Sequence, residues 1–271
     1  MILNNEEITF VGFGNMGSAI VGGILKENIF TKINIIESDT SKFKLEEKRL
    51  NFIEKINSEI NSSKFIFLCV KPQSFDDLSK IIKNFLSEDQ ILISIMAGIK
   101  ISNIQDYTEH EKVVRIMPNT PAQVSRGISV WKSSDNISNN DKITVEKILN
   151  SFGKCIEVES ENIIDICTAL SGSGPGFIYK FLESMISAGE KSGLDKEMSR
   201  ILAIETLIGS SELLRITNES PKKLREAVTS PGGTTEAGLN FMKNNDFEEI
   251  IFGTIKAAID KSIELSKESY K

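Results

Sequence analysis

Imidazole is nearly missing from this 271-residue chain, whose single histidine is His110. His110 lies between Glu109 and Glu111. A serine–histidine–aspartate triad or a histidine-rich metal site needs imidazole groups placed among other functional side chains. Both are therefore disfavoured, and we expect chemistry that proceeds largely without imidazole.

Cysteine is also scarce, and its spacing is uninformative. The three cysteines, Cys69, Cys155 and Cys167, lie far apart and form no paired spacing. Disulfide frameworks and zinc sites are both recognised in a sequence by the number and spacing of the cysteines. The sequence supports neither, and we expect no metal site.

The chain also lacks long apolar runs and an excess of basic over acidic residues. No run reaches the ~18–20 apolar residues that a membrane span requires, and the N-terminus carries Glu6 and Glu7 where a secretory signal would be positive. The 32 basic and 38 acidic residues give a net charge of −6. Nucleic acids and anionic membranes attract basic surfaces. We expect a cytoplasmic protein that binds neither.

What the first half does contain is a series of short apolar runs, separated by amphipathic stretches. The runs are residues 8–11, 33–36, 65–70, 91–95 and 113–116, and 128–131 and 156–158 are further strand candidates. Continuous apolar strands are typical of a parallel sheet that is covered on both faces. Strand–helix alternation then predicts a doubly wound, Rossmann-type α/β layer over residues 1–160.

From residue 161 to residue 271 the strand-like runs disappear and helical patterns replace them. The expected helices are residues 163–170, 177–192, 196–217, 221–228, 235–243 and 246–269. Broad apolar faces on these helices must pack against something. Because so few helices form only a thin core, we expect an all-helical dimerisation domain that shares its core with a second subunit, with a monomeric helical cap as the alternative.

A glycine motif follows the first apolar run. Residues 12–17, Gly-Phe-Gly-Asn-Met-Gly, fit G-x-G-x-x-G directly after a strand and at the start of a helix. Gly12 permits the tight turn, Gly14 lets the backbone approach a pyrophosphate, and Gly17 permits close helix–strand packing. The helix N-terminus then offers N–H groups to the phosphates. The motif predicts dinucleotide binding.

Glu37 stands 20 positions after Gly17, where an acid reads the adenosine ribose. A carboxylate there would accept from the ribose hydroxyls and repel a 2′-phosphate. Lys42 and Lys44 are close enough in sequence to offset that repulsion. The choice between NADH and NADPH stays open, and a solvated loop acid is the alternative interpretation of Glu37.

Three further loops follow predicted strands. They are Val70-Lys71-Pro72-Gln73, Ala97-Gly98 and residues 117–121, Met-Pro-Asn-Thr-Pro. Ligands of open α/β sheets bind outside the carboxyl ends of the strands. Each loop alone is also explained as turn chemistry, but together they predict a cleft at one sheet edge.

The helical half contains two loops rich in glycine and serine, residues 171–176 and residues 230–236. Loops of this kind expose backbone N–H groups to an anion. In the second loop, Thr234 or Thr235 is expected to cap the next helix, and Glu236 complements the helix dipole. These parts predict a nicotinamide reductase acting on a small anion, and a substrate that already carries its activating proton, such as an iminium, suits a site without histidine.

The chain resembles the pyrroline-5-carboxylate reductase family nearly from end to end. Residues 11–17, 70–73, 115–121 and 170–175 look like the family's blocks in the same order. The most specific block is residues 224–243, which contains Val228-Thr229-Ser230-Pro231-Gly232-Gly233-Thr234-Thr235. Generic Rossmann proteins would not share that last segment.

The resemblance implies hydride transfer from NADPH or NADH to the C=N carbon of 1-pyrroline-5-carboxylate, which gives L-proline in the last step of proline synthesis. It implies a homodimer through the C-terminal helices, often built into a larger ring. It assigns catalysis to Thr235, and substrate binding to Glu161, Ser230, Gly232, Gly233, Thr234 and Thr235. It places the cofactor along Gly12, Phe13, Gly14, Asn15, Met16, Gly17, Glu37, Ser38, Asn57, Cys69, Val70, Lys71, Pro72, Ala97 and Gly98.

Two other functions remain as alternatives. A β-hydroxyacid dehydrogenase shares the two-domain layout but needs a lysine or histidine to take a hydroxyl proton. Lys180 is the one candidate after the first glycine-rich loop, and we interpret it as part of a solvated helix face. A non-catalytic NAD(P)-sensing protein would keep the first domain but has no use for the loop at residues 230–235. The substrate could also be a related ring imine.

Overall fold

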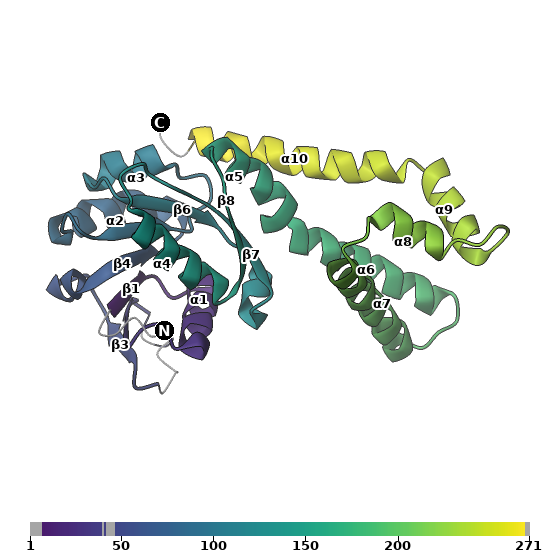
Figure 1. Cartoon of the computed structure of the whole chain (residues 1–271), viewed down its shortest axis with the longest axis horizontal. Helices are drawn as coiled ribbons and strands as arrows, with labels where there is room; N and C mark the ends of the chain where they lie inside the picture. Colours follow the sequence, from purple (N-terminus) through teal and green to yellow (C-terminus); the bar gives the residue numbers. More distant parts are fainter. Residues whose placement is uncertain (1–6, 40, 42–46, 269–271) are drawn as a thin grey trace. The chain divides into compact units, whose positions relative to one another are not determined.

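The computed structural model describes residues 7–39, 41 and 47–268, and the contacts of the chain divide it into two compact units. Unit 1 comprises residues 1–173 and 258–271, and unit 2 comprises residues 174–257. The chain therefore leaves unit 1, forms unit 2, and returns to unit 1 in its last helix (Figure 1). Lys42 and Lys44 lie outside the described residues.

Unit 1 is built on one eight-stranded sheet with the order β3-β2-β1-β4-β5-β6-β7-β8. Its strands pair in parallel, except that β6 and β7 are antiparallel. The strands are β1 (Glu7–Val11), β2 (Lys32–Ile36), β3 (Leu50–Ile53), β4 (Ser63–Leu68), β5 (Ile91–Ser94), β6 (Val113–Met117), β7 (Gly127–Ser133) and β8 (Gly153–Glu157). Of these strands, only β3 was not predicted from the sequence. The antiparallel pair of β6 and β7 makes the sheet mixed.

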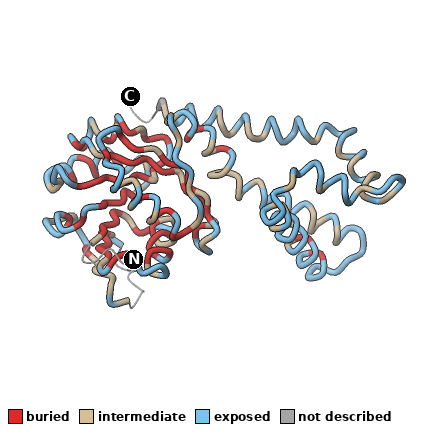
Figure 2. Tube along the Cα trace, viewed as in Figure 1, coloured by how far each residue is buried: buried red, intermediate tan, exposed pale blue. Residues whose placement is uncertain are grey.

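Helices cover both faces of this sheet. The helices of unit 1 are α1 (Asn15–Glu27), α2 (Phe75–Ile82), α3 (Ile101–Thr108), α4 (Asn139–Asn150) and α5 (Glu161–Cys167). In β4, Phe65 and Phe67 join the core that contains residues of α1 and α4, whereas Ile66 and Leu68 join the core that contains residues of α2 and α3. Successive side chains of a strand point to opposite faces, so burial on both faces explains the apolar runs. Figure 2 shows the strands of the sheet largely buried, and the doubly wound α/β layer is confirmed.

Unit 2 is entirely helical but has almost no core. It contains α6 (Gly174–Lys191), α7 (Lys196–Thr217), α8 (Pro221–Ala227), α9 (Thr234–Asn244) and the first half of α10 (Phe247–Glu268). Among residues 174–257, all of which the structure describes, only Ser199 and Ala203 are buried (Figure 2). Large apolar side chains are exposed along these helices, among them Ile201, Leu202, Ile208, Leu213, Ile216, Phe241, Ile250 and Phe252.

The helices α6 and α7 pack against each other and approach most closely at Gly189. A Cβ atom at Gly189 would lie 2.8 Å from Ser199 Oγ, so the two helices approach too closely there for any larger residue. Contacts of this kind bury little apolar surface. Unit 2 therefore has the thin core that the sequence predicted.

The contacts assign α5 to unit 1, although α5 begins at the predicted domain boundary of residues 160 and 161. The division of the chain into domains 1–160 and 161–271 stays a prediction. Across the described residues, no helix has the length and apolar character needed to cross a membrane.

Candidate functional site

The glycine motif forms a tight turn between β1 and α1. Gly12 has φ = +96°, a left-handed conformation that favours glycine. A Cβ atom at Gly12 would lie 2.8 Å from the Cys69 carbonyl oxygen, and one at Gly17 would lie 2.9 Å from the Gly12 oxygen. At Gly14 no atom lies within 4 Å of such a position. Gly12 and Gly17 therefore serve packing, and Gly14 leaves the surface of the turn open.

The N-terminus of α1 follows this turn without a side-chain cap. Gly14 is the N-cap residue, its backbone is extended, and no side chain accepts from the first turn. N–H groups in this position have no acceptor within the helix and, together with the helix dipole, favour an anion. Asn15 is exposed and Met16 is half-buried. The Phe13 side chain is buried against Phe52, with ring centroids 6.0 Å apart, so only its backbone faces the turn.

Glu37, directly after β2, is tied to that turn. Its Oε2 accepts a hydrogen bond from the Phe13 N–H at 3.0 Å, and its Oε1 accepts from the Asp39 N–H at 3.1 Å. The carboxylate therefore lies beside the glycine turn and is not a free loop acid. Ser38 next to it is exposed.

The remaining cofactor candidates follow β4 and β5. The Cys69 N–H donates to the Val11 carbonyl at 2.8 Å, which holds the end of β4 beside the glycine turn. Burial raises the pKa of the Cys69 thiol, so this group stays protonated. Lys71 and Ala97 are exposed, Val70 and Pro72 are half-buried, and Gly98 has φ = +78°. The Asn57 side chain accepts from the Glu59 N–H at 2.8 Å and so caps a short 3₁₀ turn.

A buried ionic cluster that was not expected from the sequence is centred on Arg115, in the middle of β6. Arg115 is only 1% exposed. Its Nη1 donates to Glu161 Oε1 at 3.1 Å and its Nη2 donates to Asp165 Oδ1 at 2.8 Å. The same Glu161 oxygen accepts from the Ile101 N–H at 3.0 Å. Glu161, a substrate candidate, is thus held by α3 and β6 together.

The segment after α5 corrects one expectation. Residues 171–176 were expected to form an open loop, but Thr168–Gly172 is a π-helix and α6 begins at Gly174. The Asn119 side chain donates to the Ser171 carbonyl at 3.1 Å, and a Cβ atom at Gly172 would lie 2.9 Å from the Met117 Cε. The Ser173 N–H donates to the Thr168 carbonyl at 2.8 Å, so this amide is used within the turn. π-Helical turns are frequent near functional sites.

The second loop, in unit 2, remains a candidate anion site, although its cap differs from the expectation. Gly233 is the N-cap residue of α9, and no side chain caps the helix, so neither Thr234 nor Thr235 has the capping role. The helix begins at Thr234, one residue earlier than expected, which places both threonines in its first turn. Glu236 Oε2 instead accepts from the Gly232 N–H at 2.8 Å.

The amides of this loop are only partly used. The Gly233 N–H donates to the Ser230 carbonyl at 3.0 Å. The N–H groups of Thr234 and Thr235 have no hydrogen-bond acceptor within the described part of the chain. Ser230 is exposed, and Gly232 has φ = +71°, which only glycine adopts readily. The loop therefore presents two helix N–H groups and a hydroxyl from a compact turn.

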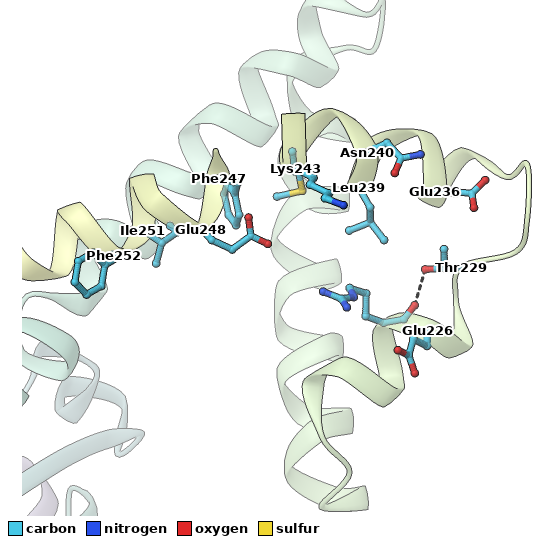
Figure 3. A pocket seen from close by; sticks show the side chains of 12 residues that line it. Glu226, Thr229, Glu236, Leu239, Asn240, Lys243, Phe247, Glu248, Ile251 and Phe252 are labelled. Carbon is cyan, nitrogen blue, oxygen red and sulfur yellow. Dashed lines mark hydrogen bonds between the residues drawn. The ribbon is translucent and has the colours of Figure 1, made fainter. Parts of the chain in front are cut away.

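A cavity of about 860 Å³ lies within unit 2 beside this loop (Figure 3). The side chains that line it come from α8, the segment after it, α9 and the start of α10. They combine apolar groups with charged ones: Arg225, Glu226, Thr229, Glu236, Leu239, Asn240, Met242, Lys243, Phe247, Glu248, Ile251 and Phe252.

The structure thus gathers the cofactor candidates and Glu161 in unit 1, and the candidates from Ser230 to Thr235 in unit 2. Lys180 belongs to neither group. Its side chain is 77% exposed and pairs with Glu183 at 3.0 Å, as expected for a solvated helix face.

Comparisons with known proteins give matches for the N-terminal half and for the C-terminal helices of the chain. Residues 161–265 match the family described as pyrroline-5-carboxylate reductase dimerisation, and residues 7–98 match the family described as NADP oxidoreductase coenzyme F420-dependent. Pyrroline-5-carboxylate reductase of Staphylococcus saprophyticus is 34% identical, over 97% of this chain and 98% of its own. Pyrroline-5-carboxylate reductase 2 of Bacillus subtilis is 34% identical, over 97% of this chain and 96% of its own.

Solved structures give the same result. The pyrroline-5-carboxylate reductase of Coxiella burnetii has a TM-score of 0.90 at 30% identity and covers 97% of this chain and 99% of its own. The Plasmodium falciparum pyrroline carboxylate reductase with NADP bound has a TM-score of 0.86 at 33% identity, over 98% of this chain and 100% of its own.

Proposed function

The chain belongs to the pyrroline-5-carboxylate reductase family, and from this premise we propose how its own residues serve the reaction. It is an oxidoreductase that reduces 1-pyrroline-5-carboxylate to L-proline with NAD(P)H. NAD(P)H, when bound, would supply the hydride that adds to the C=N carbon, and the protonated ring nitrogen of the substrate would keep the electron pair of the double bond. The protein's own residues would bind and orient the cofactor and the substrate and offset the charges of the substrate.

Unit 1 would hold the dinucleotide. The open face at Gly14 and the uncapped first turn of α1 suit the pyrophosphate. Glu37 would meet the adenosine ribose, with Ser38 and Asn57 beside it. Cys69 to Pro72 and the small pair Ala97-Gly98 would lie along the nicotinamide end, because they follow β4 and β5 at the same sheet edge.

Unit 2 would hold the substrate carboxylate. The observation that carries this proposal is the uncapped start of α9, where the N–H groups of Thr234 and Thr235 lack acceptors in the described chain and Ser230 adds a hydroxyl. Gly232 and Gly233 shape that turn. Thr235 would bond the ring nitrogen or the carboxylate and is the proposed catalytic residue.

Glu161 would act from unit 1. Its Oε1 is engaged by Arg115 and Ile101, and its side chain is 21% exposed, so part of the carboxylate reaches the surface. An anion near the substrate favours the cationic iminium form.

Assembly through the C-terminal helices is a property of the family. A homodimer explains why unit 2 exposes its apolar side chains, because a second copy can cover them. Assembly of dimers into a larger ring and a cytoplasmic location complete the proposal.

The decisive assay mixes the full chain with NADH or NADPH and either 1-pyrroline-5-carboxylate or a panel of short 3-oxo acids. We expect consumption of the reduced cofactor with the imino acid and formation of proline. Consumption with the oxo acids alone would favour the β-hydroxyacid dehydrogenase alternative. Cofactor binding without turnover of any substrate would favour a sensing protein.

A further inference from the structure

The loop between β5 and α3 is the part of unit 1 that the proposed function places along the nicotinamide end of the cofactor. Ala97 in this loop is exposed, whereas Met96, Gly98 and Ile99 around it are buried. Gly98 has φ = +78°. The loop thus offers one small residue to a ligand, and its position is set by the groups that pack against its buried residues.

Arg115 is a buried cation on the same face of β6 as Val113, because alternate residues of a strand share a face. Val113 packs in the core that contains Ile101 of α3. The guanidinium pairs with two carboxylates, Glu161 Oε1 at 3.1 Å and Asp165 Oδ1 at 2.8 Å. One carboxylate would balance the single charge of Arg115, so charge neutralisation alone does not explain the second.

The first carboxylate connects Arg115 to the end of the loop. Glu161 Oε1 also accepts a hydrogen bond from the Ile101 N–H at 3.0 Å. Ile101 is the first residue of α3, directly after the loop. Because an N–H group at the start of a helix has no acceptor within that helix, Glu161 supplies one from α5. This bond fixes the point at which the loop ends and α3 begins.

The second carboxylate connects Arg115 to the loop at Gly98. Asp165 Oδ1 also accepts from the Ser266 hydroxyl of α10 at 3.4 Å. A Cβ atom at Gly98 would lie 3.5 Å from both the Leu265 carbonyl oxygen and the Ser266 nitrogen, so this part of α10 packs against the loop. All of these residues belong to unit 1. The two hydrogen-bonding ends of one guanidinium thus lead to the same loop by two routes.

Resting on the proposed function, we propose that Arg115 is a positioning residue for hydride transfer: by binding Glu161 and Asp165 together, it fixes the loop against which the nicotinamide would lie. Arg115 acts through this loop and not by contact with the cofactor. The planar guanidinium donates in two fixed directions, which the point charge of a lysine does not reproduce. Since a misplacement of about 1 Å at the reacting groups can cost about 100-fold in rate, even a small shift of the loop should lower kcat.

The test compares Arg115→Lys with the parent chain in two measurements, kcat for the NADH-dependent reduction of 1-pyrroline-5-carboxylate and the Kd for ADP-ribose. ADP-ribose lacks the nicotinamide, so its binding reports on the adenosine half of the site and on folding, but not on the loop. We expect kcat to fall about tenfold or more, while the Kd for ADP-ribose stays within about twofold of the parent value. Both are measured at a temperature at which circular dichroism shows the variant to be folded.

Asp165→Ala is the second variant, because it removes one of the two routes and leaves Arg115 with a balanced partner in Glu161. It should show the same pattern with a smaller, severalfold fall in kcat, and it carries the test should Arg115→Lys fail to fold. Arg126→Lys is the matched control, since Arg126 is exposed and the substitution should leave both measurements unchanged.

A folded Arg115→Lys whose kcat stays within about twofold of the parent value would overturn the proposal. A parallel loss of kcat and of ADP-ribose binding would overturn it as well, because that result would show a role in general stability only. A parent chain that binds ADP-ribose but reduces no imino acid would overturn the proposed function itself, and this inference with it.

Discussion

Arg115 and Asp165, 50 positions apart in the sequence, form a buried ion pair in which Nη2 lies 2.8 Å from Oδ1. Asp165 and Glu161 are one helical turn apart on α5, so both present their carboxylates to the same guanidinium. The Ser266 hydroxyl of α10 donates to the same Asp165 oxygen at 3.4 Å. A single arginine on β6 thus secures the helix that precedes unit 2.

Replacing this arginine should be costly for stability. Arg115→Met removes the charge that pairs with two carboxylates, and a buried ion pair that loses one partner typically loses about 3–5 kcal/mol. We expect a decrease of this size in the free energy of unfolding, measured by urea denaturation. Arg126→Met is the control, because Arg126 is exposed and should change stability by less than about 0.5 kcal/mol.

Adding Glu161→Gln and Asp165→Asn to Arg115→Met should restore part of the lost stability, because these substitutions remove the two carboxylate charges that Arg115→Met leaves unpaired. If the triple variant were no more stable than Arg115→Met alone, lost packing and not unpaired charge would explain the effect.

The glycine turn gives a second prediction. Gly12→Ala forces a side chain into a left-handed conformation, costing at least about 1–2 kcal/mol, and into contact with Cys69. It should lower the melting temperature and abolish the binding of NADH, measured by the fluorescence of the reduced nicotinamide. Gly22→Ala lies within α1, where no atom is within 4 Å of the new Cβ, and should stabilise by about 0.5–1 kcal/mol with binding unchanged. Equal losses in both variants would argue against this role of the turn.

Thr235→Ala tests the substrate loop. A lost hydrogen bond to a charged group costs roughly 1.5–3 kcal/mol, so we expect kcat/KM for 1-pyrroline-5-carboxylate to fall tenfold or more while NADH binding is retained. Thr254→Ala is the matched control, since the Thr254 hydroxyl donates to the Ile250 carbonyl one turn earlier in α10 and lies outside the loop of residues 230–235. Turnover of Thr235→Ala within about twofold of the parent chain would remove Thr235 from the proposed mechanism.

His110 should make stability depend on pH. Burial lowers the pKa of His110, although the hydrogen bond from Nε2 to the Gln90 carbonyl at 2.8 Å partly opposes this. The unfolded chain therefore binds the proton more readily, and stability is complete above the unfolded pKa of about 6.5 and is lost as the pH falls below it. We expect a lower melting temperature at pH 5.5 than at pH 7.5.

The variant His110→Gln should weaken this dependence, because its amide can still donate to Gln90 but does not titrate. The relevant comparison is the change between the two pH values and not the absolute stability. An equally large change in His110→Gln would assign the effect to other groups.

The exposed helices of unit 2 predict the assembly state. Ile208 on α7 is 55% exposed, and Ile208→Glu would place a charge where a second copy is expected to pack. We expect this variant to shift from dimer, or a multiple of it, to monomer in analytical ultracentrifugation. Val124→Glu, at a residue of unit 1 that is 71% exposed, should leave the mass unchanged. A parent chain that is already monomeric would contradict the prediction.

Local patterns were sufficient for most of the fold. The predicted helix of residues 196–217 coincides with α7, because its apolar spacing is uninterrupted and Asp195 accepts from the Met198 N–H as an N-cap. The strand β3 was missed because Leu50–Ile53 is an edge strand in which only Ile53 is buried. Its Asn51 side chain bonds Asn34 Oδ1, a contact with no local signal.

The geometry around the glycine turn was predictable to a similar extent, whereas the roles of the site residues stay predictions. The glycine turn and Glu37 followed from spacing, and the structure adds the bond between them. The partners of Arg115 could not be predicted, since they lie 46 and 50 residues away. The one available signal was the four-residue spacing of Glu161 and Asp165 on a helix beside an arginine in an apolar strand.

The return of α10 to unit 1 has a consequence for how this protein is made. Because Ser266 follows unit 2 in the chain, its contact with Asp165 can form only after the whole of unit 2 has been synthesised. A nascent chain that stopped at residue 257 would have its sheet but would lack the helix end that closes over α5.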